Sequence, residues 1–210
     1  MADKREKSKK KTGKVWMSIG LLMILAALFL TCYNIWSEKQ AERASNMILE
    51  QLDPSADDLS EDDDSGEQIP RYMIDPDMEM PTILIDGHRY IGVLEIPVLG
   101  LELPVMDSWS YPKLRISPCR YQGSAYSNDM IIAGHNYNSH FGRLKTLSLG
   151  DQVIFTDVEG HQFLYCVEEI DILGKTAVEE MEAGDWDLTL FTCTYGGQSR
   201  VTVRCKKDCN

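Results

Sequence analysis

A cysteine and an arginine, separated by a short turn, stand near the C-terminal end of the sequence. Cys193 closes the alternating run LTLFTC, and Arg200 opens a second run, RVTV, after the Gly-Gly pair of the intervening segment. A thiol becomes a nucleophile when a nearby imidazolium or guanidinium favours its thiolate form. A guanidinium can also donate to the oxygen that becomes negative during acyl transfer. The plainer interpretation is a hairpin that carries a small core cysteine.

His135 is the imidazole that best fits such a site. It ends the strongly apolar run IIAGH and is followed by Asn136. His140 comes five residues later, a spacing that does not place two imidazoles on one helix face, so a zinc pair is not supported. His88 and His161 stand in polar surroundings at the start of β-like runs and are interpreted as surface residues.

The elements expected to position these residues are β-strands. Eight runs of alternating apolar and polar residues are separated by Gly, Pro, Asn and Asp: 89–96, 101–106, 114–120, 129–135, 152–157, 161–173, 187–193 and 200–206. Two short helices are expected, at 141–147 and 177–182. Because strands and helices do not alternate as in βαβ units, the pattern predicts a mainly β domain, either an antiparallel barrel or a sandwich.

The N-terminal part indicates a membrane anchor. Residues 1–14 are basic, and residues 15–37 hold no charged side chain and are mostly apolar, which is long enough to span a bilayer. Basic residues before the span predict a cytoplasmic N-terminus and an extracellular remainder. A cleaved signal peptide is the main rival, but its apolar region is shorter, at about 7–15 residues.

The remaining chain divides into a spacer and a domain. Residues 38–81 are rich in Asp, Glu and turn formers and are interpreted as an acidic, flexible stalk. Residues 82–210 form the predicted extracellular domain. The net charge is −12 despite the basic N-terminus, so the body is acidic, which argues against nucleic-acid binding.

The cysteines do not define a disulfide framework. Cys32 lies in the apolar segment, and the other five form an odd set, so at least one is unpaired within a monomer: Cys119, Cys166, Cys193, Cys205 and Cys209.

Three short motifs resemble those of the sortase family. Thr189-Leu190-Phe191-Thr192-Cys193 matches the sortase cysteine signature TLxTC at each specified position. Ala133-Gly134-His135-Asn136 resembles the histidine motif, and Arg200-Val201-Thr202-Val203 resembles the arginine strand. The order His, Cys, Arg and the anchor-and-stalk arrangement also agree, and the resemblance covers roughly residues 82–208.

The resemblance implies an eight-stranded sortase-type β-barrel with one or two short helices and a cysteine transpeptidase activity of the hydrolase class. Cys193, His135 and Arg200 would be catalytic, with Thr192 and Asn136 supporting the substrate and the oxyanion. The substrates would be secreted proteins of Gram-positive bacteria with a C-terminal LPxTG-like sorting signal, cut through a Cys thioester. The acceptor would be an amine of a peptidoglycan precursor or a pilin lysine, and neither metal nor organic cofactor is implied.

The subclass stays open between class B-like and class D-like. The segment between Cys193 and Arg200 is short, and the motif of pilin-sortase lids is incomplete at Asp75-Pro76-Asp77. Papain-like enzymes place Cys before His, and the Ser-His-Gly-Cys signature of L,D-transpeptidases is absent here. The alternative function is a non-catalytic, membrane-anchored β module that binds a cell-envelope partner.

Overall fold

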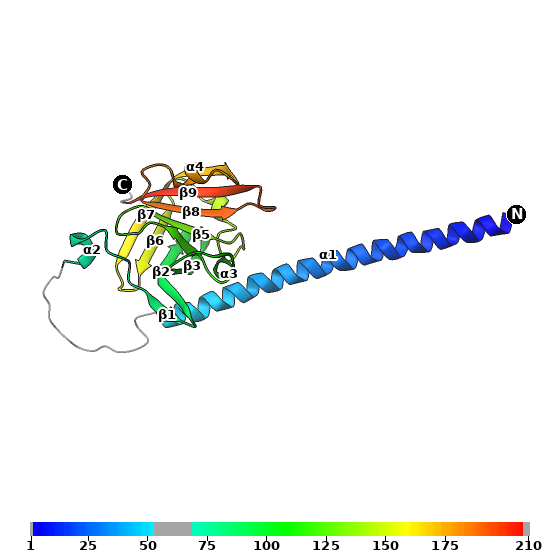
Figure 1. Ribbon diagram of the computed structural model, residues 1–210, viewed down its shortest axis with the longest axis horizontal. Coiled ribbons are helices and arrows are strands. Elements are labelled where there is room, and N and C mark those ends of the chain that lie inside the picture. Colours follow the sequence, from blue (N-terminus) through cyan, green and yellow to red (C-terminus); the bar gives the residue numbers. More distant parts are fainter. Residues whose placement is uncertain (1, 53–68, 208–210) are drawn as a thin grey trace. The chain divides into compact units, whose positions relative to one another are not determined.

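The computed structural model describes residues 2–52 and 69–207 of the chain (Figure 1). The chain divides into two compact units, Met1–Gln40 and Ala41–Asn210. Helix α1 (Ala2–Leu52) makes up the first unit and extends into the second. Its stretch from Trp16 onward is long and apolar enough to cross a membrane by length and composition, and none of that apolar window is buried. The predicted span 15–37 falls on this helix.

The second unit is built on one nine-stranded sheet. Its strands, all shown in Figure 1, are β1 (Ile83–Ile85), β2 (His88–Ile96), β3 (Leu101–Met106), β4 (Cys119–Gln122), β5 (Met130–Gly134), β6 (Gln152–Asp157), β7 (Gln162–Gly174), β8 (Leu188–Cys193) and β9 (Ser199–Lys207). The strand order is β1-β2-β3-β4-β5-β8-β9-β7-β6, and an additional pairing of β2 with β6 closes β2 to β9 into an eight-stranded barrel. The predicted mainly β barrel is therefore confirmed, and β1 extends it at the edge of β2.

Gly92 is needed where the barrel closes. The register of β2 against β3 shifts between Tyr90 and Gly92, and from Gly92 onward β2 also pairs with β6. A Cβ at Gly92 would lie 2.1 Å from the carbonyl oxygen of Thr156, and the backbone φ of +156° is one that L side chains rarely adopt. A strand glycine of this kind marks a close approach of two backbones.

The barrel interior and a smaller outer cluster bury alternate residues of the same strands. Leu188 and Leu190 of β8 belong to the main interior core, whereas Phe191 belongs to the outer cluster. Ile131 and Ala133 of β5 likewise lie in the outer cluster, with Met181 of α4. Successive strand residues point to opposite faces, so this alternation fixes which side chains the barrel presents outward near its β5–β8 edge.

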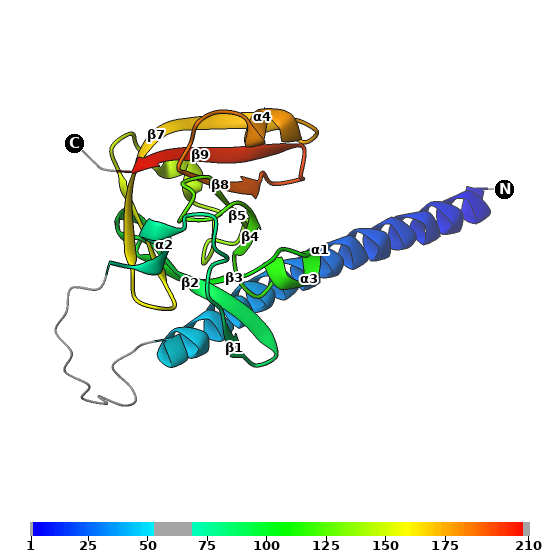
Figure 2. The same ribbon diagram turned by 60° about the vertical axis from the view of Figure 1, so that its left-hand side comes forward.

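The helices are short and lie between strands. They are α2 (Arg71–Ile74), α3 (Tyr111–Leu114), α4 (Val178–Glu182) and the 3₁₀ turns η1 (Pro97–Leu99) and η2 (Leu144–Thr146). In both views α4 lies beside β7 and β9 (Figures 1 and 2). The predicted helix at 177–182 matches α4, but the one at 141–147 is only the single turn η2.

Two other predictions about local structure were wrong. The run 114–120 was predicted as a strand, but β4 begins only at Cys119 and Leu114 ends helix α3. The hydroxyl of Ser110 accepts a hydrogen bond from the Lys113 amide and so caps α3, which begins next to Pro112.

The sheet is also not wholly antiparallel. β5 pairs with β8 in parallel over five residue pairs, and β3 pairs with β4 in parallel at a single pair. The connection from β5 to β8 runs through the β6–β7 hairpin and α4, so the two strands become parallel without a lone crossover helix.

The acidic centre of the predicted stalk, residues 53–68, lies outside the described residues. Beyond it, Tyr72 of α2 stacks on Tyr126 with ring centroids 4.7 Å apart, and Met80 is buried in the main core. Side chains N-terminal to residue 82 thus pack against the barrel. The division into 1–14, 15–37, 38–81 and 82–210 stays a prediction.

Candidate active site

Cys193 is the last residue of β8 and is exposed, whereas the five residues before it in the strand are buried. Its side chain alternates with that of Thr192 and so lies on the same outer face as Phe191. On the antiparallel neighbour β9, the residue paired with Cys193 is Arg200. Cross-strand partners place their side chains on the same face, so the thiol and the guanidinium face outward together.

His135 follows the last residue of β5, the parallel neighbour of β8 on its other side. Gly134 pairs with Thr192, so His135 continues β5 beside Cys193. Alternation from Ala133, which belongs to the outer cluster, puts His135 on the same outer face. The structure therefore brings together the three residues that the sequence singled out, at the ends of three adjacent strands.

The other described cysteines are in poor positions for nucleophilic chemistry. Cys119 and Cys205 are free but fully buried. Burial raises the pKa of the Cys119 thiol to about 12 and also raises the pKa of Cys205. Cys166 is in a disulfide, and Cys32 lies in α1. Because a thiolate is the reactive form, Cys193 is the exposed thiol of the barrel that chemistry can use.

His135 is held in a compact loop. Its carbonyl oxygen accepts a hydrogen bond from the Phe141 amide at 3.1 Å, and the amide of Gly142 donates to the carbonyl oxygen of Tyr137 at 2.8 Å. A Cβ on Gly134 would lie 2.3 Å from the Phe141 ring, so glycine is required where this ring crosses the end of β5. The imidazole of His135 stacks on the Tyr137 ring, with centroids 3.8 Å apart and planes 18° apart.

The surroundings favour the neutral form of His135. Burial lowers the pKa of His135, the charge of Arg115 lowers it further, and a side-chain hydrogen bond with Asn136 acts in the opposite direction. Nδ1 of the imidazole is buried and has no hydrogen-bond partner in the part of the chain that the structure describes. A neutral imidazole can accept a proton, which a general base requires.

Arg200 rests on the outer cluster. Its guanidinium carbon lies 6.0 Å from the centroid of the Phe191 ring, which Tyr121 of β4 meets edge-on at 5.5 Å. The Tyr121 hydroxyl hydrogen-bonds to Glu182 at the end of α4; burial and this bond raise the pKa of Tyr121. Nη1 of Arg200 is buried without a hydrogen-bond partner among the described residues. A positive group with an unused donor suits a developing negative charge.

A tight turn holds Cys193 and Arg200 opposite each other. The amide of Thr194 donates to the carbonyl oxygen of Ser199 at 2.8 Å, and the amide of Gly197 donates to the carbonyl oxygen of Thr194 at 2.9 Å. Gly196 and Gly197 both have positive φ, +83° and +65°. Such values favour glycine, so the Gly-Gly pair seen in the sequence is what permits this turn.

The two supporting residues differ in placement. Asn136 follows His135 directly and contacts its imidazole. Thr192 pairs with Val201, an interior residue, and its hydroxyl is buried with no hydrogen-bond partner among the residues described. The Thr192 side chain therefore points away from the face that carries Cys193.

Sequence reasoning missed the burial of His140 and the stacking of Tyr137. His140 is fully buried, with neither ring nitrogen hydrogen-bonded within the described chain, and its ring lies 5.6 Å from that of Tyr137. Burial lowers the pKa of His140 to about 4. An aromatic residue two positions after a candidate catalytic histidine was the available signal.

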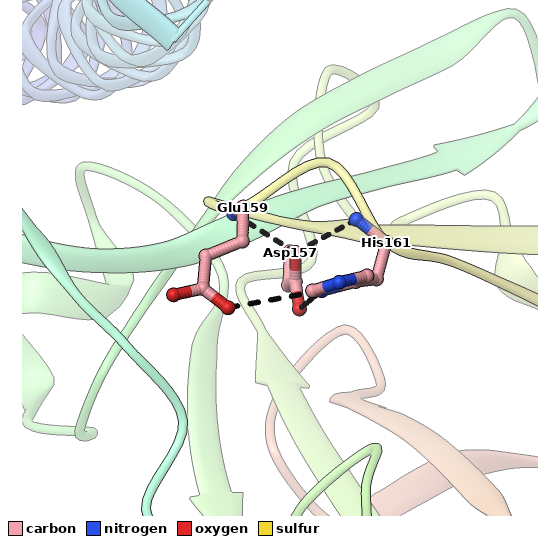
Figure 3. Close-up of side chains that lie close together, drawn as sticks. All are labelled: Asp157, Glu159 and His161. Carbon is pink, nitrogen blue, oxygen red and sulfur yellow. Dashed lines mark hydrogen bonds and ion pairs between the residues drawn. The ribbon is translucent and has the colours of Figure 1, made fainter. Parts of the chain in front are cut away.

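A second histidine cluster lies in the turn between β6 and β7. Figure 3 shows Asp157, Glu159 and His161, whose ligand atoms lie within 4.8 Å of one another, close enough to hold a metal ion. The buried Asp157 carboxylate accepts hydrogen bonds from the Tyr126 hydroxyl at 2.7 Å and from Nδ1 of His161 at 2.9 Å. It also accepts the backbone amides of Glu159 and His161. His161 is therefore a partly buried member of a network and not the surface residue that the sequence suggested.

The closed barrel thus carries an exposed cysteine beside a histidine and an arginine on neighbouring strand ends. A comparison with protein families finds a Sortase domain over residues 94–208, and the chain belongs to the sortase family. Sortases are, in general terms, cysteine transpeptidases. The family predicted from the three motifs is thus confirmed.

Solved structures show the same fold. Sortase C1 of group B Streptococcus Pilus Island 1 is 20% identical with a TM-score of 0.50, covering 57% of this chain and 64% of its own. Sortase A from Corynebacterium diphtheriae is 20% identical with a TM-score of 0.50, covering 58% and 61%. Sortase C1 from Streptococcus suis is 25% identical with a TM-score of 0.50, covering 58% and 74%. This chain thus spans less than two thirds of the first two, and no curated protein matches it.

Proposed function

We propose that this protein is a membrane-anchored sortase in which Cys193 is the nucleophile, His135 the general acid and base, and Arg200 the oxyanion-stabilising group. The observation that carries the proposal is the register of three adjacent strands. Cys193 pairs with Arg200 across β8 and β9, and β5 delivers His135 on the opposite side of Cys193. A nucleophile between a base and a cationic donor is the arrangement that acyl transfer needs.

The first half-reaction is acylation. Neutral His135 takes the thiol proton of Cys193, and in this ion-paired starting state the thiolate attacks the carbonyl carbon of the scissile peptide bond and forms a C–S bond. The carbonyl oxygen becomes negative and is stabilised by Arg200. When the C–N bond breaks, His135 gives a proton to the leaving amine, and a thioester remains on Cys193.

The second half-reaction is transfer. An incoming amine attacks the thioester carbon, His135 takes a proton from that amine, and the thiolate of Cys193 leaves. The new amide bond replaces the old one, and the enzyme returns to its starting state. Water can replace the amine, so slow hydrolysis is an expected side reaction.

The supporting residues act at the edges of this reaction. Asn136 hydrogen-bonds to His135 and so sits where it can contact the leaving or the incoming amine. Thr192 shapes the oxyanion site from the position before the nucleophile. Because the Thr192 hydroxyl is buried, this residue would act through its backbone, which is the part nearest the outer face.

The substrates that we propose are secreted proteins with a C-terminal LPxTG-like sorting signal, joined to an amine of a peptidoglycan precursor or to a pilin lysine. The basic residues before the apolar segment support a cytoplasmic N-terminus and an extracellular catalytic domain on the cell membrane. A class B-like or class D-like role is our assignment within the family.

Thioester capture tests the proposal. We would mix the full-length protein, purified in detergent, with a pooled library of LPxTG-like peptides and record intact mass spectra. The expected result is an adduct with the mass of the peptide's acyl part, released by hydroxylamine and absent from Cys193→Ala. His135→Ala should form it far more slowly.

The opposite result would favour the alternative function. If no peptide gives an adduct and Cys193 reacts with iodoacetamide no faster than an ordinary thiol, the protein is better described as a non-catalytic β module that binds a cell-envelope partner. The alkylation rate belongs in the same experiment, since it reports on the thiol without a substrate.

A further inference from the structure

Nδ1 of His135, the catalytic histidine of the proposed function, has no orienting hydrogen bond within the described chain. In thiol and serine enzymes that use an imidazole base, a third group normally hydrogen-bonds to the ring nitrogen remote from the nucleophile and fixes the ring. In His135 the buried Nδ1 has no hydrogen-bond partner in the described chain. Among the described residues, no ion pair joins His135 to a carboxylate either, and the charge that acts on it is the positive charge of Arg115.

An aromatic ring covers one face of the imidazole. The imidazole of His135 and the ring of Tyr137 are nearly parallel, 18° apart, with centroids only 3.8 Å apart. At that distance the two rings are in van der Waals contact over their faces, so the imidazole cannot rotate about its χ2 angle without a clash.

The Tyr137 ring also has a buried neighbour, and its carbonyl group is fixed by hydrogen bonds. Its ring lies 5.6 Å from the fully buried ring of His140, and its carbonyl oxygen accepts the amides of both His140 and Gly142 at 3.0 and 2.8 Å. The loop is tied back to its start because the Phe141 amide donates to the carbonyl oxygen of His135. The Tyr137 ring therefore has both the proposed catalytic ring and a fully buried ring as neighbours.

We propose that Tyr137 is the positioning residue for His135, and that its ring, backed by the buried His140, replaces the hydrogen-bonding third member of a catalytic triad. This inference rests on the proposed function of His135. The stacked ring fixes the imidazole plane and so the direction in which Nε2 points.

Asn136 is the rival for this role, since its side chain hydrogen-bonds to the imidazole. A hydrogen bond depends on a polar atom, whereas a stack depends on the flat face of a ring. The two explanations therefore predict different effects of conservative substitutions at residue 137.

The test compares Tyr137→Phe, Tyr137→Leu and Tyr137→Ala with wild type, with Asn136→Ala as the rival and Tyr111→Ala as the matched control. Tyr111 is a tyrosine 78% exposed at the start of α3, and its ring lies 5.6 Å from that of Trp109. Each variant is measured for kcat and KM in peptide cleavage and for the NMR titration of the His135 imidazole. Thermal melting shows which variants are folded.

The expected result is that Phe keeps kcat within about 3-fold of wild type, whereas Leu, of similar apolar bulk but without a ring face, lowers kcat about 30-fold at unchanged KM, as misplacement of a reacting group does. In the Leu and Ala variants the titration midpoint of His135 rises, because the ring that shields it from water is lost. Tyr111→Ala should match wild type.

Wild-type kcat and titration in a folded Tyr137→Leu variant would overturn the inference, and so would a loss of kcat in Asn136→Ala that exceeds the loss in Tyr137→Leu. The NMR titration needs no substrate. If wild type forms no thioester, the proposed function fails while the titration still reports whether Tyr137 controls His135.

Discussion

Two histidine-bearing turns of the barrel differ in how their polar atoms are satisfied. Near the ends of β5, β8 and β9, the buried polar atoms without a hydrogen-bond partner within the described chain include Nδ1 of His135, Nη1 of Arg200 and both ring nitrogens of His140. In the β6–β7 turn, the Asp157 carboxylate accepts one hydrogen bond from Glu159 and two from His161 (Figure 3). It accepts a fourth from the Tyr126 hydroxyl.

The difference separates the proposed catalytic site from a structural network. Most buried polar groups in folded proteins are hydrogen-bonded, and an unsatisfied one beside the exposed Cys193, such as Nη1 of Arg200, leaves a donor that a substrate can use. The carboxylate of Asp157 instead accepts hydrogen bonds that join the turn to the barrel. Burial and the bond to Asp157 raise the pKa of Tyr126, and Tyr126 in turn stacks on Tyr72.

Removing Arg200 should have the largest effect among the variants that sharpen this contrast. Arg200→Ala is expected to lower the rate of thioester formation about 100-fold, as the loss of an oxyanion donor does, with little change in melting temperature. Rapid-quench measurement of acylation gives the rate. Arg89→Ala, an exposed arginine on β2, is the control. Wild-type acylation in Arg200→Ala would remove the distinction between the two turns.

The buried His140 should make the β5 end sensitive to acid. Its folded pKa of about 4 is below the value of about 6.5 in an unfolded chain, so the folded state binds the proton less well. The stabilising contribution is full above pH 6.5 and is lost as the pH falls from 6.5 toward 4. The expected loss between pH 7 and pH 5 is about 2 kcal/mol.

Denaturant unfolding of wild type and of His140→Leu, at several pH values, measures this. Leu does not titrate, so the variant should lose less stability over the same interval. The lowered pKa of His135 acts in the same direction and remains in both proteins. Parallel curves for the two proteins would show that His140 is not responsible.

The strands and the position of the exposed Cys193 at a strand end could be predicted from sequence because their signals are local. Alternation over 101–106 and 152–157 matches β3 and β6, and the Gly-Gly turn predicts that Cys193 and Arg200 approach each other. Alternation reports which residues share a face, but not which strand lies next to which. The parallel pairing of β5 with β8 depends on long-range packing, and no local pattern indicates it.

The surroundings of His161 and His140 could not be predicted from local patterns either. His161 was interpreted as a surface residue because its neighbours in sequence are polar, yet it bonds to Asp157 across a turn and lies 5.0 Å from the ring of Tyr72. The burial of His140 depends on how its loop folds back over the end of β5. These contacts depend on packing between distant parts of the sequence or on the path of a loop, and neither produces a periodic pattern of residues.

Changing the Asp157 network should affect stability and not activity. Asp157→Asn keeps one acceptor oxygen for the backbone amides but loses the charge that strengthens the bonds from Tyr126 and His161. The expected destabilisation is about 1.5 kcal/mol. That corresponds to a melting temperature roughly 3–6 °C lower for a domain of this size. Acylation of a folded sample should stay within about 2-fold; a large loss of activity at full folding would mean that the turn takes part in the chemistry.

The smallest expected effect is that of zinc on the same turn. Asp157, Glu159 and His161 are close enough to hold a metal ion, but the ionised Asp157 requires Nδ1 of His161 to carry a proton and donate it. A zinc ion needs the Nδ1 lone pair and would have to displace this proton.

We therefore expect the melting temperature to change by less than about 1 °C when roughly 100 µM zinc or a chelator is added. The measurement is made on Cys193→Ala, because an exposed thiolate binds zinc by itself. A rise of several degrees that disappears in Asp157→Asn would show that the turn binds metal. In that case the hydrogen-bonded turn would be the metal-free form of a binding site, and the two histidine turns would differ in the ligand that each binds.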